Sequence, residues 1–433
     1  MSPVAEPDDP MRAFTAFWAE TSKAMINTAA AFMQAAPAPW TPPQSVFDEY
    51  RADLDGLPPE AFAVDFAPLT EAWTASLSGR ATPRQQAMLR DWQDALTVKA
   101  RLGPEYYADP DGVPTRPTPR TLVHTEGPIE LHRYDRADAP ARGAPVLIVY
   151  SVINRSWILD LSDDDSFVAH LLAAGHDVFM VEWGTTTPGE DRTLEWTITQ
   201  GLHSCVEAIS ALTGAPAVAL MGHCIGGSFG AMYAALHPER VERFFALTAP
   251  FAPAESGVVA FVSDRERFPV DQVTAASGLM PAKLIRHTFL ALKPYYELTK
   301  WRTFVKSLGD EHAMARFRLI DRWANDNVDI PAEVFRPYVR DVLQSRRLVE
   351  GAVQMGGRAV DLSAITCPVL TVLGEDDWIV RPESALVLHE VRDDQEGDRV
   401  IRLSGGHLGL LLDGKQRPRW TEISDWLAGE PAA

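Results

Sequence analysis

Short apolar runs alternate with helical patterns along the chain from residue 120 onward. Four of these runs are typical of buried strands, at 144–151, 177–183, 217–221 and 243–249. Stretches with helical periodicity, such as 166–175 and 199–214, separate most of them. Strands that alternate with helices at this spacing predict a parallel sheet covered on both faces. Two further strand-like segments flank Glu126-Gly127 and predict a hairpin before the sheet.

The alternation is interrupted between residues 252 and 360. Helical segments such as 282–292 and 311–324 occur there without a convincing buried strand. Strand patterns then return at 368–373 and 398–403, and a closing helix is expected near 419–429. A long helical insertion between the strands of one sheet predicts a cap over the active site, at about 252–360.

The N-terminal part has a different pattern. Residues 11–35 carry an apolar stripe at three- and four-residue spacings, which predicts a helix with one apolar face. The stripe consists of Phe14, Trp18, Met25, Ala29 and Phe32. Pro-rich residues 36–44 end this helix, and the Pro- and Gly-rich segment 104–119 is typical of a linker. We therefore expect an N-terminal helical region at 1–105 and a catalytic domain at 106–433. The stripe packs either on that domain or on a partner.

Composition narrows the function classes. Forty basic residues against 59 acidic ones give a net charge of −19. Nucleic acid is thus not expected as a partner, although a local basic patch could still bind a small anion. Three cysteines are too few for a disulfide framework and fit a reducing compartment. The N-terminus has no signal-peptide pattern, and no run of about 18 apolar residues predicts a transmembrane segment. We expect a cytoplasmic protein.

The segment GHCIGG at 222–227 is the candidate nucleophile turn. It joins the predicted strand 217–221 to a helix rich in small residues, as in the G-x-S-x-G elbow, with Cys224 in place of serine. In this fold the acid and then the histidine follow the nucleophile along the chain. Asp377 and His407 follow the last two predicted strands, where parallel sheets place their sites. Asp376 is the alternative acid.

A cysteine nucleophile favours thioester chemistry. A thiolate paired with imidazolium is a strong nucleophile, and thioester exchange replaces one C–S bond by another of similar energy. The oxyanion of the intermediate needs two donors, for which we assign the backbone N–H groups of Ile225 and Ile153. His223 is expected to pack at the elbow. Cys205 and Cys367 are expected to be buried small residues.

These segments resemble the polyhydroxyalkanoate synthase family. GHCIGG is similar to its cysteine lipase-like box, and the likeness continues, in order, through five further segments. These are LIVYSVINRSWILDL, DVFMVEWG, FLALKP, GGRAVDLSAITCPVL and SGGHLG. The likeness covers roughly residues 120–430 and is closest to the short synthases that work with a second subunit, the class III type.

The resemblance implies an α/β-hydrolase fold and an acyltransferase that polymerises (R)-3-hydroxyacyl-CoA into polyester. Cys224 matches the nucleophile, His407 the general base and Asp377 the acid that assists chain extension. CoA thioester is a substrate, so no cofactor is expected, and no metal ligands are assigned. Implied partners are the growing polyester, a second copy of the chain, a second synthase subunit or granule-surface proteins. The implied location is the surface of polyester granules.

Two departures from the family pattern stand out. Trp378 and Arg381 occupy places where the family usually has histidine and proline, and residues 1–105 have no counterpart in the short synthases.

Two other functions stay open. One is a cysteine-dependent hydrolase of the same fold, either an intracellular polyester depolymerase or a thioesterase. The other is a granule-associated protein without catalytic turnover.

Overall fold

The computed structural model describes residues 116–430 except 137–139, 188–191, 276, 293–299, 301–302 and 305, together with 68, 71–72, 75 and 80–91. The chain divides into two compact units, each described by itself. One combines Met1–Val113 with Arg286–Asn325, and the other combines Pro114–Ile285 with Asp326–Ala433. The apolar stripe from Phe14 to Phe32 lies outside the described residues. The domain limits at 105 and the cap limits at 252 and 360 stay a prediction.

The second unit is built on a mostly parallel sheet. Its strands are β1 (Arg120–Glu126), β2 (Ile129–Tyr134), β3 (Val146–Val149), β4 (Val178–Glu182), β5 (Val218–His223), β6 (Val241–Leu247), β11 (Val369–Gly374) and β12 (Arg399–Leu403). Among the described residues these eight strands follow the order β1-β2-β4-β3-β5-β6-β11-β12. From β4 to β12 all neighbours are parallel, whereas β1 and β2 form an antiparallel hairpin closed at Glu126 and Ile129. The predicted sheet and hairpin are confirmed.

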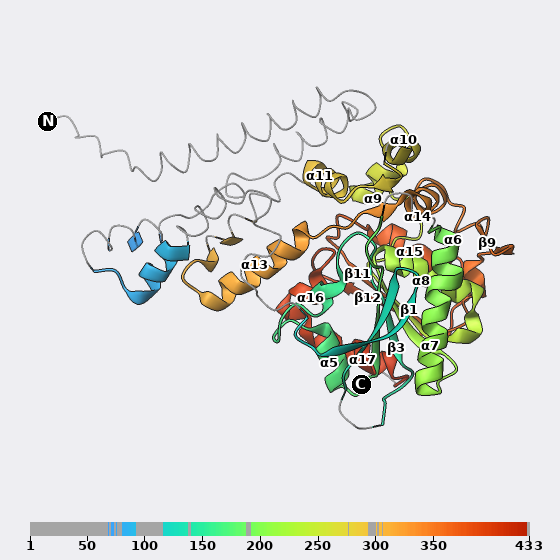
Figure 1. Ribbon diagram of the computed structural model, residues 1–433, viewed down its shortest axis with the longest axis horizontal. Coiled ribbons are helices and arrows are strands. Elements are labelled where there is room, and N and C mark those ends of the chain that lie inside the picture. Colours follow the sequence, from blue (N-terminus) through green and yellow to red (C-terminus); the bar gives the residue numbers. More distant parts are fainter. Residues whose placement is uncertain are drawn as a thin grey trace. The chain divides into compact units, whose positions relative to one another are not determined.

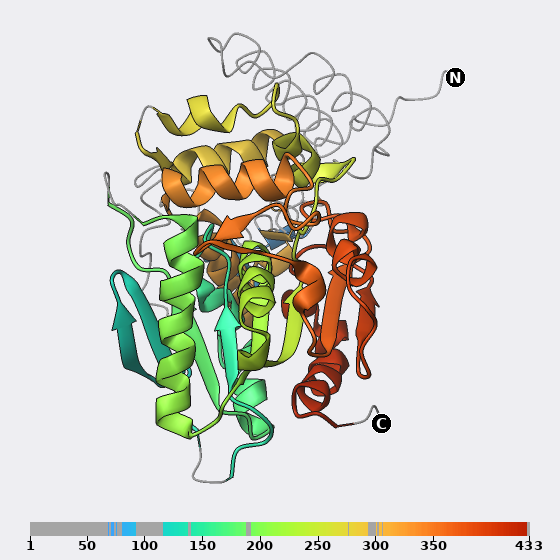
Figure 2. The ribbon, with the colours of Figure 1, turned by 90° about the vertical axis from the view of Figure 1, so that its right-hand side faces the viewer.

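Helices cover both faces of this sheet, as the near-continuous apolar strands require. Every residue of β3, β5 and β11 is buried. Helices α5 (Phe167–Ala173) and α17 (Arg417–Leu427) lie on one face, and α7 (His203–Thr213) and α8 (Ile225–Leu236) lie on the other (Figure 1). Figure 2 views the sheet from the α7 and α8 side. Around them are η3 (Ser156–Leu159), α6 (Leu194–Trp196), η4 (Thr197–Leu202), η5 (Pro238–Arg240), η7 (Leu362–Ala364), α15 (Pro382–Glu390), α16 (Gly409–Leu412) and η8 (Gly414–Gln416).

The segment between β6 and β11 is mainly helical, as predicted. It contains α9 (Gly257–Ser263), α10 (Val270–Ala275), α11 (Ala282–Leu292), α13 (Glu311–Asn325), α14 (Ala332–Tyr338) and η6 (Val339–Leu343). The expectation of no buried strand there is wrong in one detail, because β7 (Leu279–Met280) pairs with β8 (Ile330–Pro331) and both are buried. The exposed pair β9 (Gln354–Met355) and β10 (Arg358–Ala359) also lies in this segment. Two-residue strands are too short to show a periodicity. In the described part of the chain, no helix has the length and apolar character needed to cross a bilayer.

Candidate active site

Cys224 lies on the sharp turn between β5 and α8. Its backbone has φ 53° and ψ −128°, a positive φ that residues with a side chain rarely adopt. The turn depends on close backbone approach. A Cβ added to Gly222 would lie 2.4 Å from the Cα of Gly227, and one added to Gly227 would lie 2.3 Å from the Cβ of Ala249. The glycines of the box therefore allow the turn that holds the thiol at the carboxyl edge of the sheet.

Asp377 and His407 meet at the same edge. Asp377 follows β11 and His407 follows β12, and these two strands are parallel neighbours. His407 Nδ1 lies 2.8 Å from Asp377 Oδ2, and the other carboxylate oxygen accepts the N–H groups of Ile379 and Val380 at 2.8 and 3.0 Å. Asp377 is fully buried, whereas the alternative acid, Asp376, is exposed. The structure thus brings together Asp377 and His407, with Asp376 outside the pair.

The electrostatics of His407 link the pair to Cys224. Burial opposes a charge on the imidazole, but the negative charges of Asp377 and Cys224, and a side-chain hydrogen bond to each, raise the pKa of His407 to about 10. Because a carboxylate can only accept, Nδ1 carries a proton, which leaves Nε2 for the sulfur. The raised pKa therefore favours the imidazolium form of His407 at neutral pH.

This raised pKa predicts how stability depends on pH. The pKa of His407 is 6.5 without its partners, as in the unfolded chain, and about 10 in the folded chain. Its contribution to the free energy of unfolding is therefore fully present below pH 6.5. The contribution is lost as the pH rises through 10. We expect the melting temperature of the wild type to exceed that of His407→Gln by less and less as the pH is raised from 6.5 to 10. A relative stability that grows with pH over this range would contradict the ion pair.

The loop after β3 borders the elbow. A Cβ added to Gly226 would lie 2.2 Å from the carbonyl oxygen of Val149 and 2.6 Å from that of Tyr150, so only glycine lets the first turn of α8 reach this loop. Burial, and then an electrostatic contribution from Cys224, raise the pKa of the Tyr150 phenol. The loop that carries Ile153 is therefore next to the nucleophile.

The two assigned oxyanion donors differ in their surroundings. The N–H of Ile225 is at the first residue of α8, where helix N–H groups have no partner within the helix. The N–H of Ile153 instead donates to the Oγ of Ser151, which lies 3.2 Å away. An acyl oxygen would have to replace or share that hydroxyl. The role of Ile153 stays a prediction, and Ser151 is a neighbour that the sequence pattern did not single out.

The other residues considered at the sequence level are buried. His223 stacks on Tyr150 with ring centroids 4.8 Å apart, and its ring centroid is 5.2 Å from that of His407. Burial, and then the charge of His407, lower the pKa of His223, so it stays neutral as a packing residue. Burial also raises the pKa of Cys205 to about 12 and that of Cys367 to about 11. Both stay thiols at neutral pH, as expected of buried small residues.

Asp377→Asn tests the role of the acid. Asparagine keeps the size of the side chain but removes the charge that favours the imidazolium, so we expect slow turnover with some acylation of Cys224 surviving. The measurement is single-turnover acylation beside steady-state release of CoA, with the exposed Asp376→Asn as the matched control. Wild-type rates in Asp377→Asn with an inactive Asp376→Asn would move the acid to Asp376.

Known proteins match this chain over most of its length. The family described as the alpha/beta hydrolase fold matches residues 145–413. The poly(3-hydroxyalkanoate) polymerase subunit PhaC of Allochromatium vinosum is 32% identical over 345 residues, which span 77% of this chain and 96% of the relative. The subunit of the same name from Thiocystis violacea is 31% identical over 344 residues, which span 77% and 96%.

A third relative agrees with these two. The PhaC subunit of Synechocystis is 32% identical over 320 residues, which span 72% of this chain and 84% of the relative. The matches confirm both the predicted fold and the resemblance that the box and its companion segments carry. The chain belongs to the alpha/beta hydrolase fold family and, within it, to the poly(3-hydroxyalkanoate) polymerases, which are acyltransferase enzymes.

Proposed function

We propose that this chain polymerises (R)-3-hydroxyacyl-CoA into polyester through a covalent thioester on Cys224, with release of CoA. The observation that carries the mechanism is a thiol on a nucleophile turn that helps to raise the pKa of His407, a histidine that Asp377 holds in turn. The polymer class rests on the relatives, whose name is poly(3-hydroxyalkanoate) polymerase. A thiol suits this reaction because it exchanges one thioester for another with little change in bond energy.

In the loading step the thiolate of Cys224 attacks the carbonyl carbon of the acyl-CoA. The new C–S bond forms, and the carbonyl electrons move to the oxygen, which the backbone N–H groups stabilise. The oxyanion then collapses, the C–S bond to CoA breaks, and the CoA thiolate takes the proton from His407 Nε2. Cys224 now carries the acyl group, and His407 is neutral.

In the extension step neutral His407 acts as the base. Its Nε2 takes the proton of the 3-hydroxyl of an incoming hydroxyacyl-CoA, and the hydroxyl oxygen attacks the acyl carbon on Cys224. The ester C–O bond forms, the C–S bond to Cys224 breaks, and the thiolate is restored beside an imidazolium. The lengthened chain is then an acyl-CoA that repeats the loading step, so one CoA leaves for each unit added.

Partners and location follow from the same proposal. The three relatives are named as subunits, which supports a second synthase subunit as the partner of this chain. A second copy of the chain and granule-surface proteins are further partners to test. Because the polyester is apolar and stays bound during extension, the granule surface is the proposed location. Size-exclusion chromatography with light scattering, with and without a coexpressed second subunit, distinguishes these assemblies.

The deciding experiment incubates the purified chain with (R)-3-hydroxybutyryl-CoA. Release of CoA is followed with a thiol reagent, and the products are separated by size. Chloroform-soluble polymer together with free CoA supports the proposal. Free 3-hydroxybutyrate with no polymer would identify a hydrolase, and no CoA release from substrates of any chain length, alone or with a second subunit, would overturn the proposal.

A further inference from the structure

The loop between β3 and α5 contains the Ile153 donor and then folds back into the core. Its first carbonyl, that of Tyr150, accepts the indole N–H of Trp183 at 2.9 Å. Further along, the short helix η3 buries all four of its residues, Ser156 to Leu159. A loop that presents main-chain N–H groups to a reacting oxygen must keep its backbone in one position, since catalysis by such donors depends on their orientation.

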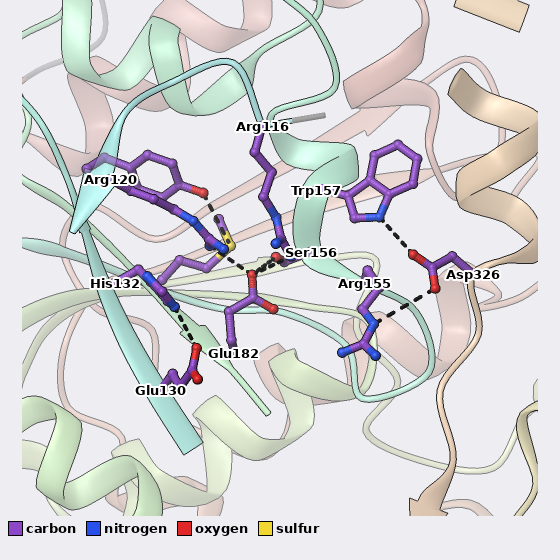
Figure 3. Close-up of polar contacts among 11 residues, drawn as sticks. Arg116, Arg120, Glu130, His132, Arg155, Ser156, Trp157, Glu182 and Asp326 are labelled. Carbon is purple, nitrogen blue, oxygen red and sulfur yellow. Dashed lines mark hydrogen bonds and ion pairs between the residues drawn. The ribbon is translucent and has the colours of Figure 1, made fainter. Parts of the chain in front are cut away.

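One support is the carboxylate of Glu182 at the end of β4. Its Oε1 accepts the hydroxyl of Ser156 at 2.5 Å and the guanidinium groups of Arg116 and Arg120, each at 2.9 Å (Figure 3). Burial would raise the pKa of Glu182, but the two arginines and the Ser156 hydroxyl lower it, so the carboxylate stays charged. A charged acceptor makes the bond from Ser156 stronger than one between neutral groups.

The arginine side of this cluster is itself fixed. Arg116 has φ 63°, a left-handed conformation that a residue with a side chain adopts only when its surroundings require it. Its backbone N–H donates to the carbonyl oxygen of Asp160, at 3.1 Å, just past η3. Asp160 in turn accepts the hydroxyls of Thr118 and Ser166, at 2.8 and 2.6 Å. The segment before β1 therefore binds the residue directly after η3, through Arg116 and Thr118.

A second support comes from residues 326–328. Asp326 Oδ2 accepts the indole N–H of Trp157 at 3.0 Å, and Asp326 Oδ1 lies 3.9 Å from Nε of Arg155 (Figure 3). The main chain of the two segments also pairs. Asn154 and Asn327 form an antiparallel bridge, and the N–H of Val328 donates to the carbonyl oxygen of Ile153 at 2.9 Å. This last bond fixes the peptide group immediately after the assigned donor.

We propose that Glu182 and Asp326 are positioning residues of the active site, which hold the β3–α5 loop from two sides so that its N–H groups face an acyl oxygen on Cys224. Glu182 acts through Ser156, and Asp326 acts through Trp157, while the N–H of Val328 holds the carbonyl group of Ile153. Neither carboxylate takes part in bond formation. The inference rests on the proposed function only for the acylation of Cys224, and it does not depend on which acyl group is transferred.

The test separates the reactivity of the thiol from the stabilisation of the oxyanion. Acylation of Cys224 by p-nitrophenyl butyrate passes through a tetrahedral oxyanion, whereas alkylation by iodoacetamide does not. For Ser156→Ala, Glu182→Gln and Asp326→Ala we expect the acylation kcat to fall by about 10- to 100-fold, with KM changed less than about twofold. The alkylation rate should stay within about twofold of the wild type, because Cys224 and His407 keep their contacts.

Each matched control removes one carboxylate charge close to Glu182 or to Asp326. Glu130 pairs directly with Glu182 in the sheet, but its carboxylate contacts His132, at 2.9 Å, instead of the loop (Figure 3). The carboxylate of Asp329 accepts the N–H of Ala282 at 2.7 Å and, among the residues that the structure describes, makes no bond to the loop. Glu130→Gln and Asp329→Ala should acylate at the wild-type rate. Thermal melts accompany each variant, and if Glu182→Gln does not fold, Ser156→Ala decides alone because it leaves the carboxylate with both arginines.

Two results would overturn the inference. A folded Ser156→Ala and a folded Asp326→Ala with wild-type acylation would show that the loop needs neither support. A parallel fall in the alkylation rate would show that the variants change the reactivity of the thiol and not the oxyanion donors.

Failure of the proposed function can be recognised separately. A wild-type chain that releases no CoA from (R)-3-hydroxybutyryl-CoA can still be assayed by acylation of Cys224 with the ester. The double variant Ser156→Ala/Glu182→Gln should lose no more than Ser156→Ala alone, because alanine removes the Ser156–Glu182 contact and glutamine only removes the charge that strengthens it.

Discussion

Cys224→Ala is expected to abolish both covalent acylation and CoA release. Alanine fits the turn between β5 and α8 as well as cysteine does, but it removes the atom to which the acyl group is bound. Cys224→Ser should keep only a trace of activity, because the hydroxyl is far less acidic than the thiol and gives no anion beside His407. Intact-protein mass spectrometry after exposure to substrate measures the acyl adduct, and a thiol reagent measures CoA.

The control uses the two other thiols of the chain. Cys205 and Cys367 are both buried and free, and their raised pKa values keep them protonated. Cys205→Ala and Cys367→Ala should therefore retain the acyl adduct and release CoA at close to the wild-type rate. If the adduct persisted in Cys224→Ala and disappeared in one of these variants, the assignment of Cys224 as the nucleophile would be wrong.

His407→Gln is the second change with a large expected effect. Glutamine can still bond to Asp377, but it neither holds a proton beside the thiolate nor accepts one from a hydroxyl. At pH 7 an unassisted thiol is only a few per cent thiolate, so alkylation of Cys224 by iodoacetamide should fall about tenfold or more. Turnover, which needs the base in both steps, should fall by about 10³-fold or more.

The matched control is a histidine away from the site. His389 Nε2 lies 2.9 Å from the Oγ1 of Thr371, and burial lowers its pKa. His389→Gln should leave both alkylation and turnover near the wild-type values. If His407→Gln alkylated at the wild-type rate near neutral pH, some other group would have to hold the thiolate, and the assignment of the base would be wrong.

The strands and the fold class could be predicted from the sequence because buried parallel strands are almost wholly apolar. The runs 217–221 and 368–373 agree with β5 and β11 to within about two residues. The pair β7 and β8 could not be predicted in this way, since two residues carry no periodicity. For the N-terminal stripe the sequence prediction stands alone, because those residues lie outside the described part of the chain.

The site was predictable where local sequence sets the geometry. Glycines around Cys224 indicate the turn, and the position of His407 after a strand places it at the same edge. The choice between Asp376 and Asp377 depends on which carboxylate turns inward, and the structure buries Asp377. Ser156 and Glu182 are 26 positions apart and meet only through the sheet, so no local pattern reveals their bond.

The backbone of Cys224 has a consequence for attempts to make this enzyme more heat-resistant. A left-handed conformation at a residue with a side chain destabilises the fold by about 1–3 kcal/mol, and glycine would relieve much of that strain. Selection for a higher melting temperature alone therefore rewards the loss of the thiol at this position. Libraries screened for thermostability should hold Cys224 constant, or couple each round of heating to an assay of acyl transfer, if the gain is not to be an inert protein.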